Sequence, residues 1–137
     1  MKVFFDSSGL AKRYIRESGS GAVESILDEA SDVAISLICP PEIISALSRL
    51  RRQALISPGQ FEDAKSALFN DLEDMLICGI TGPVIDKTIG LLELHAIRTI
   101  DALHVATAIE WRAGLFVSAD RRQLRAASAS GLDIKQV

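Results

Sequence analysis

The sequence predicts an α/β fold, in which a parallel sheet carries helices on both faces. Short apolar runs alternate along the chain with longer segments whose apolar residues recur every three or four positions. Strands that alternate with helices in this way form parallel sheets, because each crossover returns the chain to the same edge. A chain of 137 residues, 48% of them hydrophobic, has the size and composition of one domain, residues 1–137.

Five short runs are the expected strands. Most are rich in Val, Ile, Leu or Phe and end at a turn or a helix-start signal. In chain order they are Lys2–Phe5, Val33–Ser36, Leu76–Ile80, Leu115–Ser118 and Asp133–Val137.

Helical periodicity fills the intervals between these runs. A helix is expected after Asp6, through Leu10 to Ile15, and a second from Val23 to Ala30, beyond the break at Gly19-Ser20-Gly21. The paired prolines 40 and 41 suit the opening of a third helix, which runs to about Ala54, and the turn Ser57-Pro58-Gly59 precedes a fourth with apolar positions from Phe61 to Met75. The later helices are expected over Val84–His95, over Ile100–Ala113 with Thr99 as N-cap and Gly114 as stop, and after Asp120.

Charge and cysteine content restrict the partners and the compartment. The net charge of −3 argues mildly against nucleic acid, but ten of the fifteen cations are arginine and nine cations form three clusters. The clusters are Lys12, Arg13 and Arg16; Arg49, Arg51 and Arg52; and Arg121, Arg122 and Arg125. The cysteines form no CxxC pair, and no apolar stretch is long enough for a signal peptide or a membrane span. We therefore expect a cytoplasmic protein with free thiols and no membrane association.

Four carboxylates stand where function gathers in such folds. Asp6 follows the first strand directly, Asp120 follows the Leu115–Ser118 strand after one residue, and Glu42 and Asp101 lie in the first turns of helices. Because ligands bind at the carboxyl ends of the strands in an open α/β sheet, we expect these acids at one edge. Bare carboxylates at close range repel one another, and a divalent cation with a preference for oxygen, Mg²⁺ or Mn²⁺, relieves that repulsion.

Each acid also has a simpler explanation. Acids at helix starts are favoured by capping and by the helix dipole, which accounts for Glu42, Asp101 or Asp120 taken singly. Asp6 is harder to explain in this way, since Ser7 could fill the same capping role. The convergence of four acids on one edge favours a metal site, at which a metal ion activates water and binds a scissile phosphate.

Several polar residues near these acids have open roles. Ser7 and Ser118 could orient water or phosphate, or could cap the chain locally. His104 lies three residues after Asp101 and is expected to be a packed, hydrogen-bonded helix residue rather than a general base or ligand.

Four motifs in the same order resemble PIN-domain ribonucleases, in particular the VapC-type toxins of bacterial toxin–antitoxin pairs. The matching segments span nearly the whole chain: Val3–Tyr14, Pro41–Leu47, Ile100–Ala108 and Phe116–Arg122, the last followed by Ala126-Ala127 and Gly131-Leu132. The two prolines before Glu42 depart from the family's usual pattern and affect only the expected start of that helix.

The resemblance implies a metal-dependent endoribonuclease with Mg²⁺, or Mn²⁺, held by Asp6, Glu42, Asp101 and Asp120. It places Ser118 where the family has Thr or Ser, and it implies an RNA substrate, a homodimer and a cognate antitoxin. Two alternatives remain. A phosphatase-like α/β domain built on Asp6 needs a second acid nearby, which Ser7-Ser8 does not supply, and a non-catalytic PIN-like binding module is expected to have lost one or more of the acids.

Overall fold

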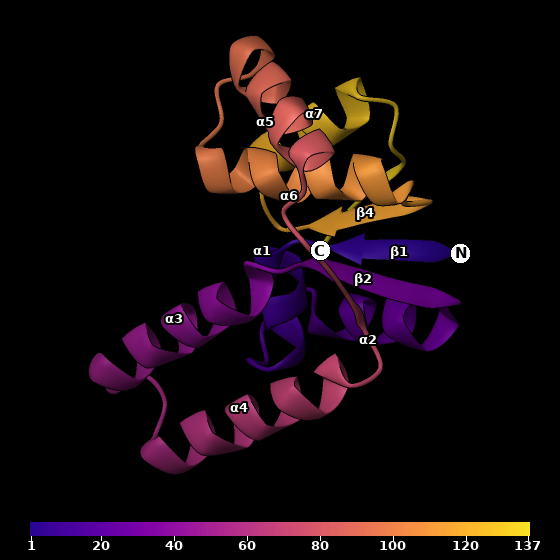
Figure 1. The fold of residues 1–137 in the computed structure, drawn as a ribbon. Helices are drawn as coiled ribbons and strands as arrows, with labels where there is room; N and C mark the ends of the chain where they lie inside the picture. The colour runs from indigo at the N-terminus through magenta and orange to yellow at the C-terminus, as the bar shows by residue number, and fades with distance from the viewer.

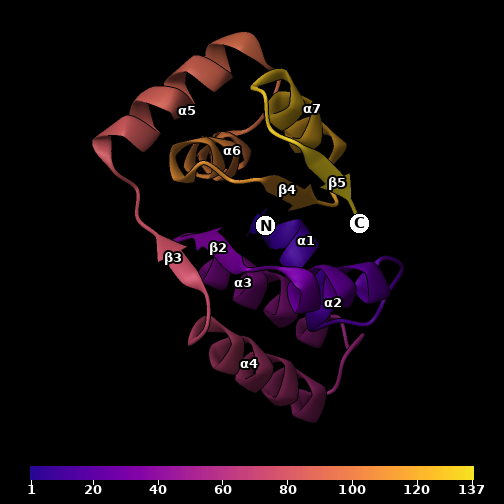
Figure 2. The same cartoon turned by 90° about the vertical axis from the view of Figure 1, so that its right-hand side faces the viewer.

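Five parallel strands form one sheet with the first strand at its centre. The computed structural model describes all 137 residues, and the strand order is β3-β2-β1-β4-β5 (Figures 1 and 2). Every pairing is parallel, as the alternation of strands and helices predicts. The strands are β1 (Lys2–Phe5), β2 (Asp32–Ser36), β3 (Leu76–Cys78), β4 (Leu115–Ser118) and β5 (Ile134–Gln136).

Helices cover both faces of the sheet, which confirms the predicted fold class (Figures 1 and 2). On one face lie α1 (Ser7–Leu10), the 3₁₀ turn η1 (Ala11–Arg13), α2 (Ser20–Glu29), α3 (Cys39–Arg52) and α4 (Pro58–Leu72). On the other face lie α5 (Gly82–Leu94), α6 (Thr99–Trp111) and α7 (Arg121–Ala129).

The central strand is buried on both sides. Phe5 packs in the core beneath α2, α3 and α4, whereas its neighbour Phe4 packs in the core beneath α5, α6 and α7. Successive side chains of a strand point to opposite faces, so a strand between two helix layers must be apolar at consecutive positions. The run Val3-Phe4-Phe5 meets this requirement and places the residue that follows it at the edge of the sheet.

The helix expected from Asp6 to Ile15 is interrupted. Only α1 is α-helical, and the chain then tightens into η1 before Tyr14. Arg13 Nε and the Tyr14 hydroxyl both donate to Asp71 of α4, at 2.9 and 2.8 Å. Tertiary contacts thus hold this segment in place of a continuous helix.

Several expected boundaries are wrong by a few residues. Thr99 is the first residue of α6 rather than its N-cap, which is Arg98, and the helix ends at Trp111 because Arg112 turns left-handed at φ 61°. Gly114 lies against β1 instead, where its N–H donates to the Lys2 carbonyl at 2.8 Å and a Cβ would stand 3.0 Å from Met1 Cγ.

The remaining differences are smaller. The expected turn at Ser57 is a capping box that starts α4, with Ser57 and Gln60 bonded reciprocally. Met75 and Ala54 lie beyond their helices, and β3 ends at Cys78 rather than Ile80. Both cysteines are free, as expected, and none of the helices is long and apolar enough to span a membrane.

Candidate active site

The carboxyl ends of β1 and β4 meet at a topological switch point of the sheet. The chain continues from β1 to β2 on one side and from β4 to β5 on the other, so the connections diverge between these two neighbouring strands. Such switch points are where open α/β sheets bind their ligands. Asp6 follows β1, Ser118 ends β4, and the Asp6 N–H donates to the Val117 carbonyl at 3.2 Å.

Asp6 is fully buried at this switch point and both of its carboxylate oxygens are hydrogen-bonded. Oδ1 accepts from the Gly9 N–H at 2.8 Å, and Oδ2 accepts from the hydroxyls of Ser8 at 2.7 Å and Ser118 at 2.8 Å. Burial raises the pKa of Asp6, opposed by nearby His104 and by these donors. Asp6 is itself the N-cap of α1, so the expectation that Ser7 could fill this role is wrong.

Ser7 forms a hydrogen bond with Glu42, a second acid of the site, instead. Its hydroxyl donates to Glu42 Oε1 at 2.6 Å, from α1 across to the first turn of α3. His104 Nε2 lies 2.5 Å from the same oxygen and 3.2 Å from Ser7 Oγ. Partial burial acts to raise the pKa of Glu42, but the hydrogen bonds from His104 and Ser7 prevail and lower it.

His104 is packed in α6 and hydrogen-bonded, as expected, but its partner is a site acid. The ring is 1% exposed. Because Glu42 Oε1 accepts, Nε2 carries the proton in this contact. Nδ1 is buried without a partner. The spacing of three residues from Asp101 is the sequence signal that brings His104 to the same end of α6.

Asp101 and Asp120 occupy the starts of α6 and α7. Asp101 lies in the first turn of α6, and its Oδ1 accepts from Gln123 Nε2 of α7 at 3.0 Å. Burial, and next the negative charge of Asp120, raise the pKa of Asp101. Asp120 is the N-cap of α7, with Oδ1 accepting from the Arg122 N–H at 2.8 Å.

Two polar residues of this site were missed in the sequence. Ser8 bonds Asp6, and its oxygen also accepts from the Ala119 N–H at 3.1 Å, so it ties the β1 loop to the β4 loop. Gln123 is buried on the inner face of α7. A glutamine in the otherwise apolar stripe that includes Leu124 and Ala127 is the signal that could have found it.

The structure brings the four predicted acids to one edge without a basic counter-ion. None forms an ion pair with lysine or arginine, and the one ionisable partner within ion-pair distance is His104, which lies against Glu42. The acids do not form a closed cage, because no three His, Cys, Asp or Glu side chains are close enough to share one ion directly. The site is therefore an acidic cluster at the sheet edge, with one fully buried acid and three partly exposed ones.

Acids on strand ends and helix starts at the β1–β4 switch point define this molecule as an α/β domain with an acidic site at one sheet edge. The profile of the PIN domain family matches residues 3–129. The chain belongs to the PIN domain family.

Named relatives lie among toxin ribonucleases. Ribonuclease VapC45 of Mycobacterium tuberculosis is 30% identical over 135 residues, which cover 94% of this chain and 91% of the relative. A chain of the VapBC2 complex from Rickettsia felis, solved with a promoter DNA fragment, has a TM-score of 0.70 at 17% identity and covers 100% of this chain and 99% of its own length. VapC20 of Mycobacterium tuberculosis, a sarcin-ricin loop cleaving toxin, has a TM-score of 0.69 at 16% identity, covering 95% of each chain.

Proposed function

We propose that this protein is a Mg²⁺-dependent endoribonuclease and the toxin of a toxin–antitoxin pair. The observation that carries the proposal is the gathering of Asp6, Glu42, Asp101 and Asp120 at one sheet edge with no lysine or arginine ion-paired to any of them. We propose these four carboxylates as the metal site, with Mn²⁺ able to replace Mg²⁺. The relatives named as ribonucleases support the reaction class.

The donor set suits a hydrated Mg²⁺ ion. This ion keeps several waters and takes one or two protein carboxylates, so it does not require three ligands in direct contact. Glu42 and Asp120 each have one oxygen fixed by a hydrogen bond from the protein and a second oxygen with no such donor, and Asp101 is held through Oδ1 by Gln123. Bound there, Mg²⁺ would supply Lewis-acid stabilisation of charge on the phosphate and a more acidic water.

The protein's own groups would bind the substrate phosphate and hold the site acids in position. Backbone N–H groups at the starts of α6 and α7 face the same edge and favour a phosphate. The hydroxyls of Ser8 and Ser118 hold Asp6 in place, and Ser7 with His104 holds Glu42. Fixed acids hold charge where it is needed without reorganisation during the reaction.

Arginines without an acidic partner supply the attraction for RNA. Arg13 forms an ion pair with Asp71, and Arg16 forms one with Glu24. Most of the cluster Lys12, Arg13 and Arg16 is therefore already neutralised by acids of the same chain. Several exposed arginines form no ion pair, among them Arg49 and Arg52 on α3 and Arg121, Arg122 and Arg125 on α7.

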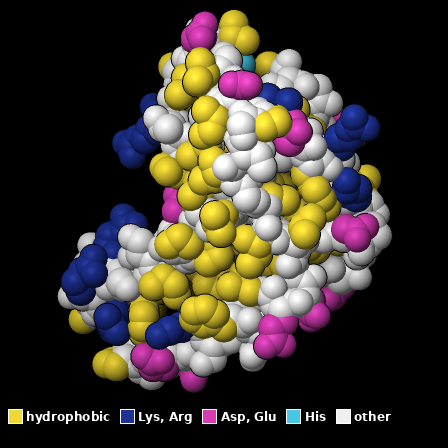
Figure 3. Space-filling model, viewed as in Figure 1, with side chains coloured by type: hydrophobic (Ala, Val, Ile, Leu, Met, Phe, Trp, Pro, Cys, Tyr) yellow, Lys and Arg dark blue, Asp and Glu magenta, His cyan; other side chains and the backbone are white.

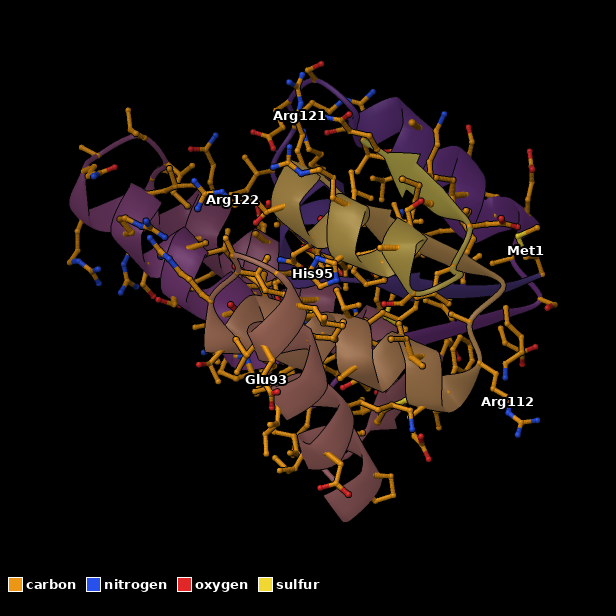
Figure 4. All side chains as sticks on the ribbon, turned by 90° about the horizontal axis from the view of Figure 1, so that it is seen from above. Met1, Glu93, His95, Arg112, Arg121 and Arg122 are labelled. Atoms are coloured by element: carbon orange, nitrogen blue, oxygen red, sulfur yellow. The ribbon has the colours of Figure 1, made fainter.

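These arginines without an ion pair are placed to bind the phosphate backbone of an RNA strand that crosses the acidic site. Figure 3 shows basic side chains on both sides of a recess, one group over α3, and Figure 4 shows Arg121 and Arg122 at the start of α7. A groove of about 560 Å³ adjoins the site between η1 and α3, with Ser8, Lys12 and Arg49 among its lining residues. Phosphates held on either side would offset repulsion from the net charge of −3.

The two alternatives fit less well. A phosphoacceptor role for Asp6 needs a carboxylate oxygen free to attack phosphorus, whereas Asp6 is enclosed with both oxygens bonded. A role beside a hydrated metal ion does not need that attack, because Asp6 can act through its charge and through water. A non-catalytic module would not need four acids at the switch point.

We also propose a cognate antitoxin and a homodimer as partners. Structural relatives include the VapBC2 complex and a toxin–antitoxin complex from Klebsiella pneumoniae. Exposed apolar side chains on α5, Ile85, Ile89 and Leu94, offer surface for a protein partner.

Cleavage of total cellular RNA tests the proposal directly. We expect discrete fragments from the wild type in Mg²⁺, none in EDTA and none from Asp101→Asn in Mg²⁺, because that change removes one carboxylate charge at the same shape. Sequencing of the fragment ends would identify the target. Cleavage that persists in EDTA would contradict the metal site, and a wild type that neither cleaves RNA nor binds Mg²⁺ would indicate the non-catalytic module.

Salt dependence tests the arginines. Arg49→Gln combined with Arg122→Gln is expected to weaken RNA binding and to reduce the magnitude of the slope of log K against log salt by about 0.7 for each single-strand phosphate that is no longer neutralised. The matched control is Arg16→Gln, an exposed arginine already paired with Glu24 at 2.8 Å. Equal slopes for the double variant and the control would argue against RNA binding by Arg49 and Arg122.

A further inference from the structure

Gln123 is a buried glutamine whose contact links two helices of the site. Its side chain is on the inner face of α7 and its residue is 4% exposed. Nε2 donates to Asp101 Oδ1 at 3.0 Å, across from α7 to the first turn of α6. An ionised carboxylate accepts only, so this contact fixes which way the amide points. The amide therefore holds one oxygen of Asp101 from the side of α7.

The other half of the amide has no partner. Gln123 Oε1 is buried and accepts no hydrogen bond. A buried acceptor without a donor costs folding free energy, so packing alone favours an apolar residue at this position. The neighbouring residues on the same helix face, Leu124, Ala126 and Ala127, are apolar. Gln123 therefore carries a cost to stability together with one contact, and that contact is to a site acid.

We propose that Gln123 is a positioning residue that orients Asp101 toward the metal ion. The inference rests on the proposed function, which assigns Asp101 to the metal, and adds a residue beyond the four acids. The side chain acts through Asp101: by holding Oδ1 it limits rotation of the carboxylate at the sheet edge that Asp101 shares with Glu42 and Asp120. Partners that orient ligands in this way typically change metal affinity by about 10–100-fold when removed.

Direct metal binding provides the test. Gln123→Met keeps the length of the side chain and removes both the donor and the unpaired acceptor. We expect the Kd for Mn²⁺, measured by isothermal titration calorimetry, to rise about 10–100-fold, while the melting temperature in EDTA stays equal or increases. Cleavage should recover as Mg²⁺ is raised. The control is Thr88→Val, which removes another buried hydrogen bond, from Thr88 Oγ1 to the Val84 carbonyl, and should leave the Kd unchanged.

A double-mutant cycle separates this role from a general packing effect. If Gln123 acts through Asp101, Gln123→Met should not weaken Mn²⁺ binding further in an Asp101→Asn background. Gln123→Leu replaces Gln123→Met as the test variant if the methionine variant fails to fold. Far-UV circular dichroism spectra show whether each variant is folded. A wild type that binds Mn²⁺ and a Gln123→Met variant that binds equally well would overturn the role of Gln123 alone. A wild type that binds no Mn²⁺ would overturn the metal proposal and this inference together.

Discussion

Asp6→Asn is expected to reduce RNA cleavage by roughly 10²–10³-fold, the loss seen when a preorganised electrostatic group is removed from an active site. The change keeps the shape of the side chain and its capping contact, because asparagine caps helices as well as aspartate does. It removes the charge of the one acid that is fully buried between β1 and β4. Initial rates in saturating Mg²⁺ would measure the effect.

The same variant should be more stable than the wild type when no metal is present. Burial raises the pKa of Asp6, so the folded state binds this proton more readily than the unfolded chain. Stability from this group is therefore complete below the ordinary pKa of an aspartate and is lost as the pH rises through the folded value. Asp6→Asn removes this loss, and its melting temperature in EDTA at pH 7 should exceed that of the wild type.

A surface substitution supplies the control for both measurements. Asp63→Asn replaces an exposed acid in the middle of α4 and should change neither cleavage nor the melting temperature. A lower melting temperature for Asp6→Asn in EDTA would contradict a destabilising buried charge, and unchanged cleavage would contradict the role of Asp6 in the reaction.

The location of the four acids could be predicted from the sequence because it depends on the order of elements. In a parallel sheet the carboxyl end of every strand lies at one edge. A strand such as Lys2–Phe5 that ends at Asp6 therefore fixes where that acid lies, without knowledge of any contact.

The partners of these acids could not be predicted in this way. Which of Ser7 and Ser8 bonds Asp6 depends on the short turn of α1, where adjacent residues point in different directions: Ser8 faces Asp6 and Ser7 faces Glu42. The contact between Gln123 and Asp101 joins α6 and α7, 22 residues apart, and follows from how these helices pack.

Helix ends were predicted least well, for a related reason. Glycine is the residue that most readily turns left-handed after a helix, so Gly114 was the natural stop for α6. Arg112 adopts that conformation instead, and Gly114 is used where the backbone approaches β1. The second use arises only once the helix has docked on the sheet.

Gly9→Ala is expected to destabilise the protein by about 1–3 kcal/mol, as overpacking of a well-packed core does. Gly9 lies in α1 where this turn touches β4. A Cβ at this position would stand 2.9 Å from the Val117 carbonyl oxygen, 3.2 Å from Asp6 Oδ1 and 3.3 Å from Ser118 Cα. Two of these three atoms are backbone and cannot rotate away, so α1 must move. Urea unfolding of the two proteins would measure the difference.

The same movement of α1 should also lower the rate of RNA cleavage, because α1 carries hydrogen-bond donors to two site acids. Gly9 N–H and Ser8 hold Asp6, and Ser7 holds Glu42. Misplacement of reacting groups by about 1 Å can cost 10²-fold in rate, so we expect cleavage to fall by up to roughly that factor even where the variant remains folded. Gly90→Ala in α5 is the matched control: a Cβ there meets nothing within 4 Å, and the change should stabilise the helix by roughly 0.5–1 kcal/mol without altering cleavage. A Gly9→Ala protein as stable and active as the wild type would mean that the contact between α1 and β4 does not set the positions of Asp6 and Glu42.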